Sequence, residues 1–516
     1  MSVLLTHLLT SNEPPHSSSE CQSTYDLLTS AQAVLASVET EITALNASLA
    51  MALSRRDATL QSIARHRAIL SPIRYLPTEI LQHIFSLINP PADAFAQRSW
   101  ESDFRAPWAV GVVCRAWRQA ALGHPGLWSV LTLTERVPKA MLHTRRQMLE
   151  VQLDRISGCT ELGAHVLLWG RPDDDLFDLL LSFSGRWESL RFNFESCAGS
   201  NIWPRRVNAL DSVLSGASFP KLRTIEIIGS VPGAIPAVLA SAPNLRELRF
   251  RQHKQSANLL RLSGVPLAQL THLEVPYLGR TEALNVLSCT PHLIECVLST
   301  AKRHGWNVAP DQQYFEPGSI KLPYLRRFCY HTHDTDTDIL PFLDLPAVED
   351  LSLHRSSADS LVRYLLSQSS PSAIRRLSMW ECTKATASNL LAMCLDCLPW
   401  LQFLLVDSTN GQEGLELLQS LNTGERCPSL ESLVYSSELN CQTFDAFRTL
   451  VATRGRRGNG AGRLSYLRIF QSPPTFFSPE MSCFSEEAAA MKQSFGVDTA
   501  LLRSHEIAVS KRSWCL

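Results

Sequence analysis

The sequence predicts an α/β fold in which a long N-terminal helix and a small helical unit precede a solenoid of alternating strands and helices. Three observations carry this prediction: a seven-residue apolar repeat within residues 28–52, two apolar helical stretches within residues 70–131, and a short phrase that recurs from residue 187 to residue 470. Because the units of a solenoid stack side by side, we expect an arc or horseshoe with parallel strands on its concave face.

The composition places the chain among globular proteins. Of its 516 residues, 45% are hydrophobic and 19% are charged, which excludes a largely disordered chain. The net charge of −1 gives no overall field that would attract nucleic acid or an anionic membrane. No apolar run approaches the roughly 18 residues of a membrane span, and the first residues lack the pattern of a secretory signal. We therefore expect a cytoplasmic or nuclear protein whose 14 cysteines are mostly reduced.

Shifts in composition divide the chain into five segments. We expect a flexible N-terminus at 1–24, a long amphipathic or coiled-coil helix at 25–69, a helical unit at 70–131, a repeat array at 132–475, and a C-terminal cap or tail at 476–516. Within the last segment, a short helix is expected to begin at Ser485.

The long helix carries an apolar seam of the coiled-coil kind. Leu28, Leu35, Ile42 and Leu49 lie seven residues apart, and a second set follows three residues after each of them. This spacing is typical of a two-stranded seam, so self-association through residues 28–70 is one interpretation. A long helix that lies on its own protein is the other, and the sequence leaves both open.

The helix expected after Pro77 is apolar around more than half of its circumference. The apolar positions are Ile80, Leu81, Ile84, Phe85, Leu87 and Ile88. Such a helix needs burial on two sides, and one side can face its own domain. The second side requires more of this chain or a partner. A second helix is expected to carry an apolar face from Val112 to Ala121 and to end at Gly123.

Residues 70–131 resemble the F-box family. The family pattern Leu-Pro-x-Glu-Ile/Leu-Leu-x-x-Ile-Phe, then Val-Cys-x-x-Trp-Arg, then Pro-x-Leu-Trp is met by Leu76, Pro77, Glu79, Ile80, Leu81, Ile84 and Phe85, by Val113, Cys114, Trp117 and Arg118, and by Pro125, Leu127 and Trp128. The spacer of some 20 residues between the first two parts is longer than in a compact F-box.

The resemblance implies a function and a set of contacts. F-box proteins dock onto a Skp-family adaptor, which links them to a cullin and a RING subunit, and they act as substrate receptors of SCF-type ubiquitin ligases without catalysing a reaction themselves. The implied first contact set is Leu76, Pro77, Ile80, Leu81, Ile84 and Phe85. Val113, Cys114, Trp117 and Trp128 are implied as a second contact set or as the internal core of the unit. The alternative is a repeat scaffold without coupling to a ligase.

The repeated phrase has the form Leu-x-x-Leu-x-apolar, often after a proline. Its first apolar residue, called the anchor below, recurs at intervals that average about 28 residues. The anchors are Trp187, Leu222, Leu245, Leu270, Leu293, Leu325, Val348, Ile374, Leu401, Leu430 and Leu464. The array resembles the leucine-rich-repeat domains often found after an F-box, although it keeps no asparagine ladder.

The exposed positions of the repeated strands are candidates for binding a protein target. Arginine and aromatic side chains on a concave surface are common binding anchors. The candidate residues are Arg249, Arg251, His331, Arg376, Trp380, Tyr466, Arg468 and Phe470. Trp380, Tyr466 and Phe470 are the predicted hydrophobic anchors, and the alternative for Trp380 and Phe470 is that they tuck under a loop.

No motif predicts an enzyme, a metal centre or a cofactor. The run from Cys329 to Asp338 contains two histidines and three aspartates, but no second cluster supports a metal site, so it is interpreted as a solvated polar loop. The basic, glycine-rich stretch 453–463 is interpreted as a surface insertion rather than a nucleic-acid contact. We expect no catalytic residue, no metal ligands, and no nucleic-acid or membrane partner.

Overall fold

The computed structural model describes most of the chain between residues 17 and 503. The described residues are 14, 17–87, 106–134, 139–158, 164–169, 174–193, 216–229, 235–251, 267–300, 315–332, 338–355, 358–367, 373–382, 395–408, 411–422, 426–437, 441–455, 464, 466–471 and 498–503. The chain divides into two compact units, Met1–Ile84 and Phe85–Leu516, which are described separately. Within the described ranges, no helix is both long and apolar enough to cross a bilayer.

The first unit is dominated by one helix, α2 (Ser18–Ile69), of 52 residues. A capping box begins it: the Glu20 amide donates to Ser17 Oγ at 3.1 Å, and the Ser17 amide donates to Glu20 Oε2 at 3.3 Å. No glycine or proline interrupts the helix, so it continues for about 78 Å at 1.5 Å per residue. None of its residues is buried, which means that the apolar seam is not covered within its own unit.

Two short elements follow α2. They are the 3₁₀ helix η1 (Pro72–Tyr75) and the helix α3 (Thr78–Ser86). Helix α3 occupies the position expected from Pro77, and Glu79 lies in its first turn, where the helix dipole favours a negative charge.

The second apolar helix expected from the sequence is broken into two. Helix α5 (Ala106–Val113) ends at Cys114, and α6 (Arg115–Leu122) begins after it. Cys114 has an extended backbone, and its Sγ accepts a hydrogen bond from the Trp117 amide at 3.5 Å, so it caps α6. The prediction of one continuous helix was therefore wrong. The 3₁₀ helix η3 (Pro125–Trp128) follows the end of α6 at Gly123 and leads directly into the first strand, β1 (Val130–Thr134).

One parallel sheet forms the framework of the second unit. Among the described residues it has 14 strands, and their spatial order follows the chain order. After β1, its strands are β2 (Ala164–Trp169), β3 (Trp187–Asn193), β4 (Thr224–Ile228), β5 (Glu247–Arg251), β6 (His272–Leu278), β7 (Glu295–Thr300), β9 (Arg327–Thr332), β11 (Asp350–His354), β12 (Arg376–Cys382), β13 (Phe403–Ser408), β14 (Ser432–Ser437), β15 (Tyr466–Gln471) and β16 (Asp498–Arg503). A parallel sheet in chain order is a solenoid-like arrangement.

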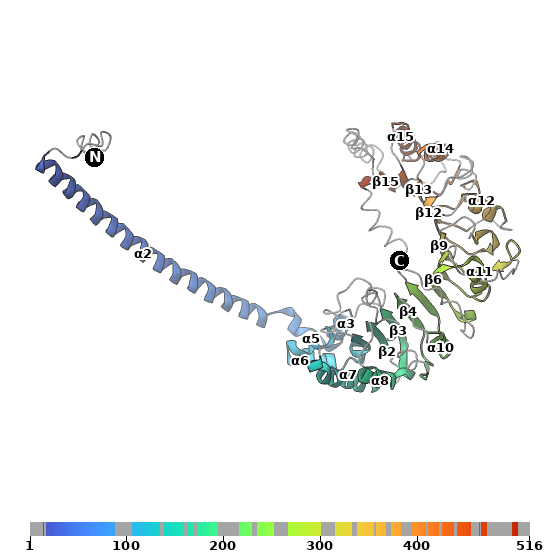
Figure 1. Cartoon of the computed structure of the whole chain (residues 1–516), viewed down its shortest axis with the longest axis horizontal. Helices are drawn as coiled ribbons and strands as arrows, with labels where there is room; N and C mark the ends of the chain where they lie inside the picture. Colours follow the sequence, from blue (N-terminus) through green and yellow to red (C-terminus); the bar gives the residue numbers. More distant parts are fainter. Residues whose placement is uncertain are drawn as a thin grey trace. The chain divides into compact units, whose positions relative to one another are not determined.

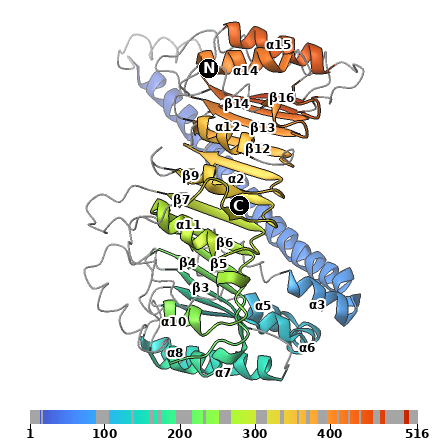
Figure 2. The ribbon, with the colours of Figure 1, turned by 90° about the vertical axis from the view of Figure 1, so that its right-hand side faces the viewer.

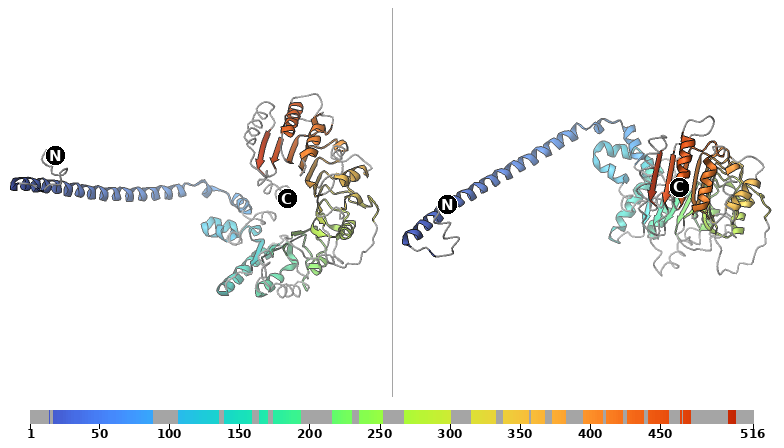
Figure 3. Two further views of the ribbon diagram at one scale, coloured as in Figure 1. Left: turned by 45° about the horizontal axis from the view of Figure 1, so that its top comes forward. Right: turned by 90° about the horizontal axis from the view of Figure 1, so that it is seen from above.

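Helices cover one face of this sheet. They are α7 (Leu142–Ser157), α8 (Asp174–Leu181), α10 (Ile235–Ala240), α11 (Arg280–Ser288), α12 (Ala358–Ser367), α14 (Gly411–Asn422) and α15 (Cys441–Gly455). Figure 1 shows the helices on the outer side of the curved sheet and the strands along its inner side, and the two turned views agree (Figures 2 and 3). Strands β8 (Ile320–Lys321) and β10 (Leu343–Asp344) form a separate two-stranded sheet.

The repeated phrase accounts for the core. Every predicted anchor, from Trp187 to Leu464, is buried with at most 1% of its surface exposed. Beyond Trp187, with which β3 itself begins, each anchor lies two residues before the start of a strand. The residue after an anchor joins neighbouring repeats: the Arg246 amide donates to the Arg223 carbonyl, and the Thr271 amide donates to the Arg246 carbonyl, both at 2.8 Å. Each anchor therefore lies in a buried position directly before a strand or, for Trp187, at its first residue.

The sheet extends beyond the repeated phrase at both ends. Strands β1 and β2 precede the first anchor. Strand β16 lies in the segment expected to be a cap or tail, yet it pairs in parallel with β15 and continues the sheet. The helix expected from Ser485 and the basic stretch 456–463 lie outside the described residues.

Candidate functional site

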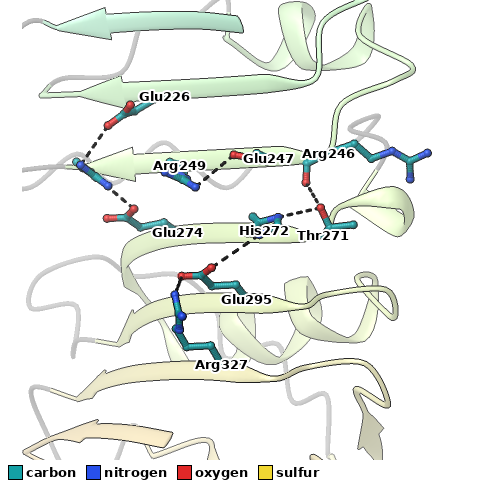
Figure 4. A network of polar contacts seen from close by, with 10 residues as sticks. Glu226, Arg246, Glu247, Arg249, Thr271, His272, Glu274, Glu295 and Arg327 are labelled. Atoms are coloured by element: carbon teal, nitrogen blue, oxygen red, sulfur yellow. Dashed lines mark hydrogen bonds and ion pairs between the residues drawn. The ribbon is translucent and has the colours of Figure 1, made fainter. Parts of the chain in front are cut away.

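The face of the sheet opposite the helices, called the inner face below, carries a row of acidic and basic side chains. In register order the row runs Glu247, His272, Glu295, Arg327, Asp350 and Arg376. Glu295 pairs with Arg327 at 3.0 Å and faces His272 at 3.7 Å. Asp350 then lies 3.8 Å from Arg327 and 3.5 Å from Arg376. Figure 4 shows the part of this row on β5 to β9. Acidic and basic residues lie next to one another from Glu295 to Arg376, and His272 lies between two glutamates, so neither sign of charge dominates the row.

A second row of ion pairs lies on the same face, on β3 to β6. Glu226 is buried between Arg191 at 3.4 Å and Arg251 at 3.3 Å, and Arg251 also reaches Glu274 at 3.2 Å. Glu226 and Glu274 are labelled in Figure 4. Burial raises the pKa of Glu274, and the charge of Arg251 opposes that rise. Arg249 and Arg251, both predicted to bind a target, are partly exposed but already paired with carboxylates of the chain, Arg249 with Glu247 at 3.3 Å.

The inner face becomes apolar towards the C-terminal strands. The Arg376 guanidinium lies over the Phe403 ring at 4.5 Å. Trp380, Phe403, Leu405 and Val434 then form a buried apolar cluster. Trp380 is only 4% exposed, so the prediction that it is a free hydrophobic anchor was wrong, and the alternative that it is covered describes it better. The reason is the register, which places this ring among other apolar side chains.

The remaining predicted anchors lie on β15. The backbone of Tyr466, Arg468 and Phe470 pairs with that of Ser432, Val434 and Ser436 on β14. Their side chains lie outside the described residues.

A groove of about 450 Å³ runs along the starts of strands β7 to β14. Glu295, Arg327, Asp350, Arg376 and Phe403 line it from the strands. The groove is also lined by the residues that directly follow the anchors, before the strands begin: Ile294, Arg326, Glu349, Arg375, Gln402 and Glu431. The sequence analysis did not predict this second set. Polar residues directly follow five successive anchors, from Leu325 to Leu430, and this pattern could have indicated it. The groove therefore carries both signs of charge, and the Phe403 ring lies beneath Arg376 in its lining.

His331 lies further along the same face, beside a cysteine and a second histidine, which are residue types that can bind metal ions. Its Nε2 is 3.5 Å from Cys329 Sγ, and its ring stacks on that of His354 with centroids 3.6 Å apart. The sequence placed His331 with His333, Asp334 and Asp336 instead, but residues 333–337 lie outside the described residues. Asp338 is buried and accepts a hydrogen bond from the Leu340 amide.

Helix α3 presents two different apolar stripes. Leu81 and Phe85, four residues apart, are 4% and 0% exposed, whereas Ile80 and Ile84 are 47% and 36% exposed. Residues four apart share a helix face, so one stripe is buried and the neighbouring one is open. The implied contact set divides accordingly. Leu81 and Phe85 are interior residues rather than surface contacts, which corrects the expectation, while Leu76 is half-buried and Pro77 is exposed.

The core behind Phe85 is aromatic. The Phe85 and Trp117 rings lie 5.1 Å apart, and the Trp108 and Trp128 rings meet edge to face at the same distance. Trp128 donates its indole N–H to the Ala121 carbonyl at 2.9 Å, and the Arg155 guanidinium lies 3.9 Å from its ring centroid. Burial lowers the pKa of Arg155. Trp128 is thus a core residue, the second of the two roles left open for it.

Comparison with protein families supports the motif. The F-box-like family model matches residues 73–134. This segment is an F-box-like domain. The match covers most of the predicted unit 70–131 and ends at residue 134, just inside the predicted repeat array 132–475. No curated protein matches the chain.

Several apolar side chains of the F-box-like domain are exposed to solvent and are therefore accessible to a partner. Ile80, Ile84 and Leu87 are exposed on or next to α3, and Val112 and Val113 are exposed at the end of α5. Cys114 is exposed as well, and Trp117 is half-buried. F-box domains generally bind Skp-family adaptors.

Proposed function

We propose that this chain is the substrate receptor of an SCF-type ubiquitin ligase. Its F-box-like domain binds a Skp-family adaptor and through it a cullin and a RING subunit, while the inner face of a leucine-rich-repeat array binds a target protein. The chain itself catalyses no reaction and acts in the cytoplasm or nucleus. The observation that carries the proposal is the F-box-like domain at residues 73–134, whose first helix keeps an apolar stripe exposed.

The exposed stripe supports adaptor binding on physical grounds. Ile80 and Ile84 present branched apolar side chains to water on a helix of nine residues. Burying one such side chain is worth roughly 1.5–3 kcal/mol. A helix that inserts this stripe into a groove of the adaptor recovers that energy, which is a common mode of recognition.

The inner face supports target binding. Its groove offers Arg376 stacked on Phe403 beside Asp350 and Glu349, a combination of an aromatic wall with both signs of charge. An extended segment of a partner with alternating charge matches that lining. Because neither sign of charge dominates the row, we expect a protein target rather than a nucleic acid.

The test is a double substitution on the open stripe, Ile80→Asp with Ile84→Asp. Two carboxylates at an apolar interface would be buried without partners, so adaptor binding in a pulldown with purified Skp-family adaptor is expected to be lost. Phe85 is left intact because it is fully buried, and its substitution would unfold the domain.

A matched control tests whether two added surface charges elsewhere in the chain also affect adaptor binding. Leu366→Asp with Trp400→Asp places two charges at exposed apolar residues of the array, outside the F-box-like domain. This variant is expected to bind adaptor like the wild type. Unchanged binding by the Ile80/Ile84 variant would refute the proposed interface, and no binding by the wild type would favour the alternative of a repeat scaffold without ligase coupling.

We further propose that α2 pairs with a second copy of this chain. Leu28, Leu35, Ile42 and Leu49 are 51–58% exposed along one seam of the helix. Apolar side chains at this spacing pack knobs-into-holes when a second helix lies alongside. The receptor would then be a dimer with paired N-terminal helices.

A further inference from the structure

We propose that Cys329, His331 and His354 form a binding site for a zinc-class divalent metal ion on the inner face of the sheet. The three side chains come from neighbouring strands, β9 and β11, whose register sets His331 opposite His354 and Cys329 opposite Ser352. Their sulfur and ring nitrogen atoms all lie within 4.8 Å of one another.

The spacing of the first two ligands already fits a tetrahedral ion. Cys329 Sγ lies 3.5 Å from His331 Nε2. With Zn–S near 2.3 Å and Zn–N near 2.0–2.1 Å, the sulfur–nitrogen edge of a tetrahedral site is about 3.6 Å. The two residues lie two apart on one strand, so their side chains point to the same side of the sheet. This pair therefore needs almost no adjustment to share a metal ion.

The third ligand requires a larger adjustment of two rings. The His331 and His354 rings are stacked, with centroids 3.6 Å apart and planes 13° from parallel. Imidazole lone pairs lie in the ring plane, so nearly parallel rings direct them side by side instead of at one point. Two imidazoles that bind one tetrahedral zinc ion have ring centroids about 5 Å apart, so the rings must turn and also separate by about 1.5 Å. Rotation of the two side chains about χ1 and χ2 is the movement that metal binding requires.

The surroundings hold these residues in place. Cys329 is buried, and both histidines are half-buried. Trp380 stacks on the far side of His354 at 5.7 Å and 16°, so one ring of the pair rests against the buried apolar cluster. Such support orients a metal-binding imidazole.

The donor set selects the class of ion. One thiolate and two imidazoles suit zinc and its spectroscopic substitute cobalt, whereas magnesium and calcium prefer oxygen ligands. Three ligands from the chain leave one position of a tetrahedral ion for water.

Cobalt binding tests the proposal with the purified full-length chain. Titration with Co²⁺ is expected to produce a thiolate-to-cobalt absorption band that saturates near one equivalent and disappears when Zn²⁺ is added. Cys329→Ser is expected to abolish the band. His331→Ala and His354→Ala are each expected to weaken cobalt binding by about tenfold or more, and binding should weaken as the pH falls because protons compete for all three ligands.

Matched controls exclude binding by other residues. Cys289→Ser and His292→Ala remove an exposed cysteine and an exposed histidine elsewhere in the array and are expected to leave the titration unchanged. Circular dichroism establishes that each variant is folded. If the wild type gives no thiolate band, or if Cys329→Ser retains it, the three residues form only a hydrogen bond and a stacked pair, and the proposal is overturned. Adaptor binding is tested by substitutions at Ile80 and Ile84, so a negative result for cobalt binding does not affect the proposed ligase function.

Discussion

Leucines at regular spacing occupy opposite environments in the two units. In α2 the residues of the seven-residue repeat, Leu28 to Leu49, are more than half exposed. In the sheet, the anchors of the roughly 28-residue repeat are at most 1% exposed. The difference follows from what each element can cover with its own chain. Each strand and helix of the array packs against the next repeat of the same chain, whereas no residue of α2 is buried by the described part of its own unit.

Helix α3 combines both situations in nine residues. Its Leu81–Phe85 stripe is buried like the anchors of the array, and its Ile80–Ile84 stripe is open like the seam of α2. Exposed apolar residues at helical spacing thus mark the places where a second molecule is expected. Substitutions at buried and at exposed apolar residues should therefore have different effects on stability and on association.

The largest effect is expected at an anchor of the array. Leu325→Ala removes a fully buried side chain and leaves a cavity, so the free energy of unfolding should fall by about 2–5 kcal/mol. Leu28→Ala makes the same chemical change on α2, at a side chain that is 51% exposed, and should cost less than about 0.5 kcal/mol in the monomer. Urea unfolding followed by circular dichroism measures both. Equal losses would contradict this expectation.

The next effect concerns association and leaves the fold intact. Leu35→Asp with Ile42→Asp places charges in the seam of α2, and the protein is expected to change from dimer to monomer in sedimentation-velocity experiments. The control, Ala33→Asp with Thr40→Asp, places two charges with the same seven-residue spacing at exposed positions on the opposite side of the helix and should preserve the dimer. A wild-type protein that sediments as a monomer at micromolar concentration would rule out pairing through α2.

The smallest effect is a pH dependence of stability. Burial lowers the pKa of His165 on β2 from its ordinary value of 6.5, against the opposing charge of Glu188. Below pH 6.5 the unfolded chain takes up a proton that the folded chain resists, so the free energy of unfolding should decrease as the pH falls from 7.5 to 5.5. His165→Gln should reduce this decrease, while substitution of the exposed His292 should not. An identical decrease in the His165 variant would show that other groups cause it.

The parts of the structure that could be predicted from the sequence are those set by local pattern. The anchors are fixed by a leucine phrase that demands burial before each strand, and the F-box motif appears as a run of matched residues. Which stripe of α3 is buried could not be predicted, because all its apolar positions look alike in sequence. The break at Cys114 depends on a sulfur atom that accepts an amide hydrogen bond, a weak signal in the sequence.

Pairings between strands were also beyond local pattern. His331 and His354 are 23 positions apart, and only the register of β9 with β11 brings their rings together. The burial of Trp380 depends in the same way on Phe403 and Leu405 of the following strand. Alternation along each strand indicates the face of the sheet on which a side chain lies, but the neighbours on that face come from other repeats.

Strand β1 belongs both to the matched F-box-like segment, which ends at residue 134, and to the sheet. It follows Trp128 after a single residue, and the Ser129 carbonyl already accepts the His165 amide at 2.8 Å. Residues 106–134 therefore join the array without any flexible tether. Because backbone hydrogen bonds span this junction, residues 106–134 and the first strands of the sheet are expected to move together as one body.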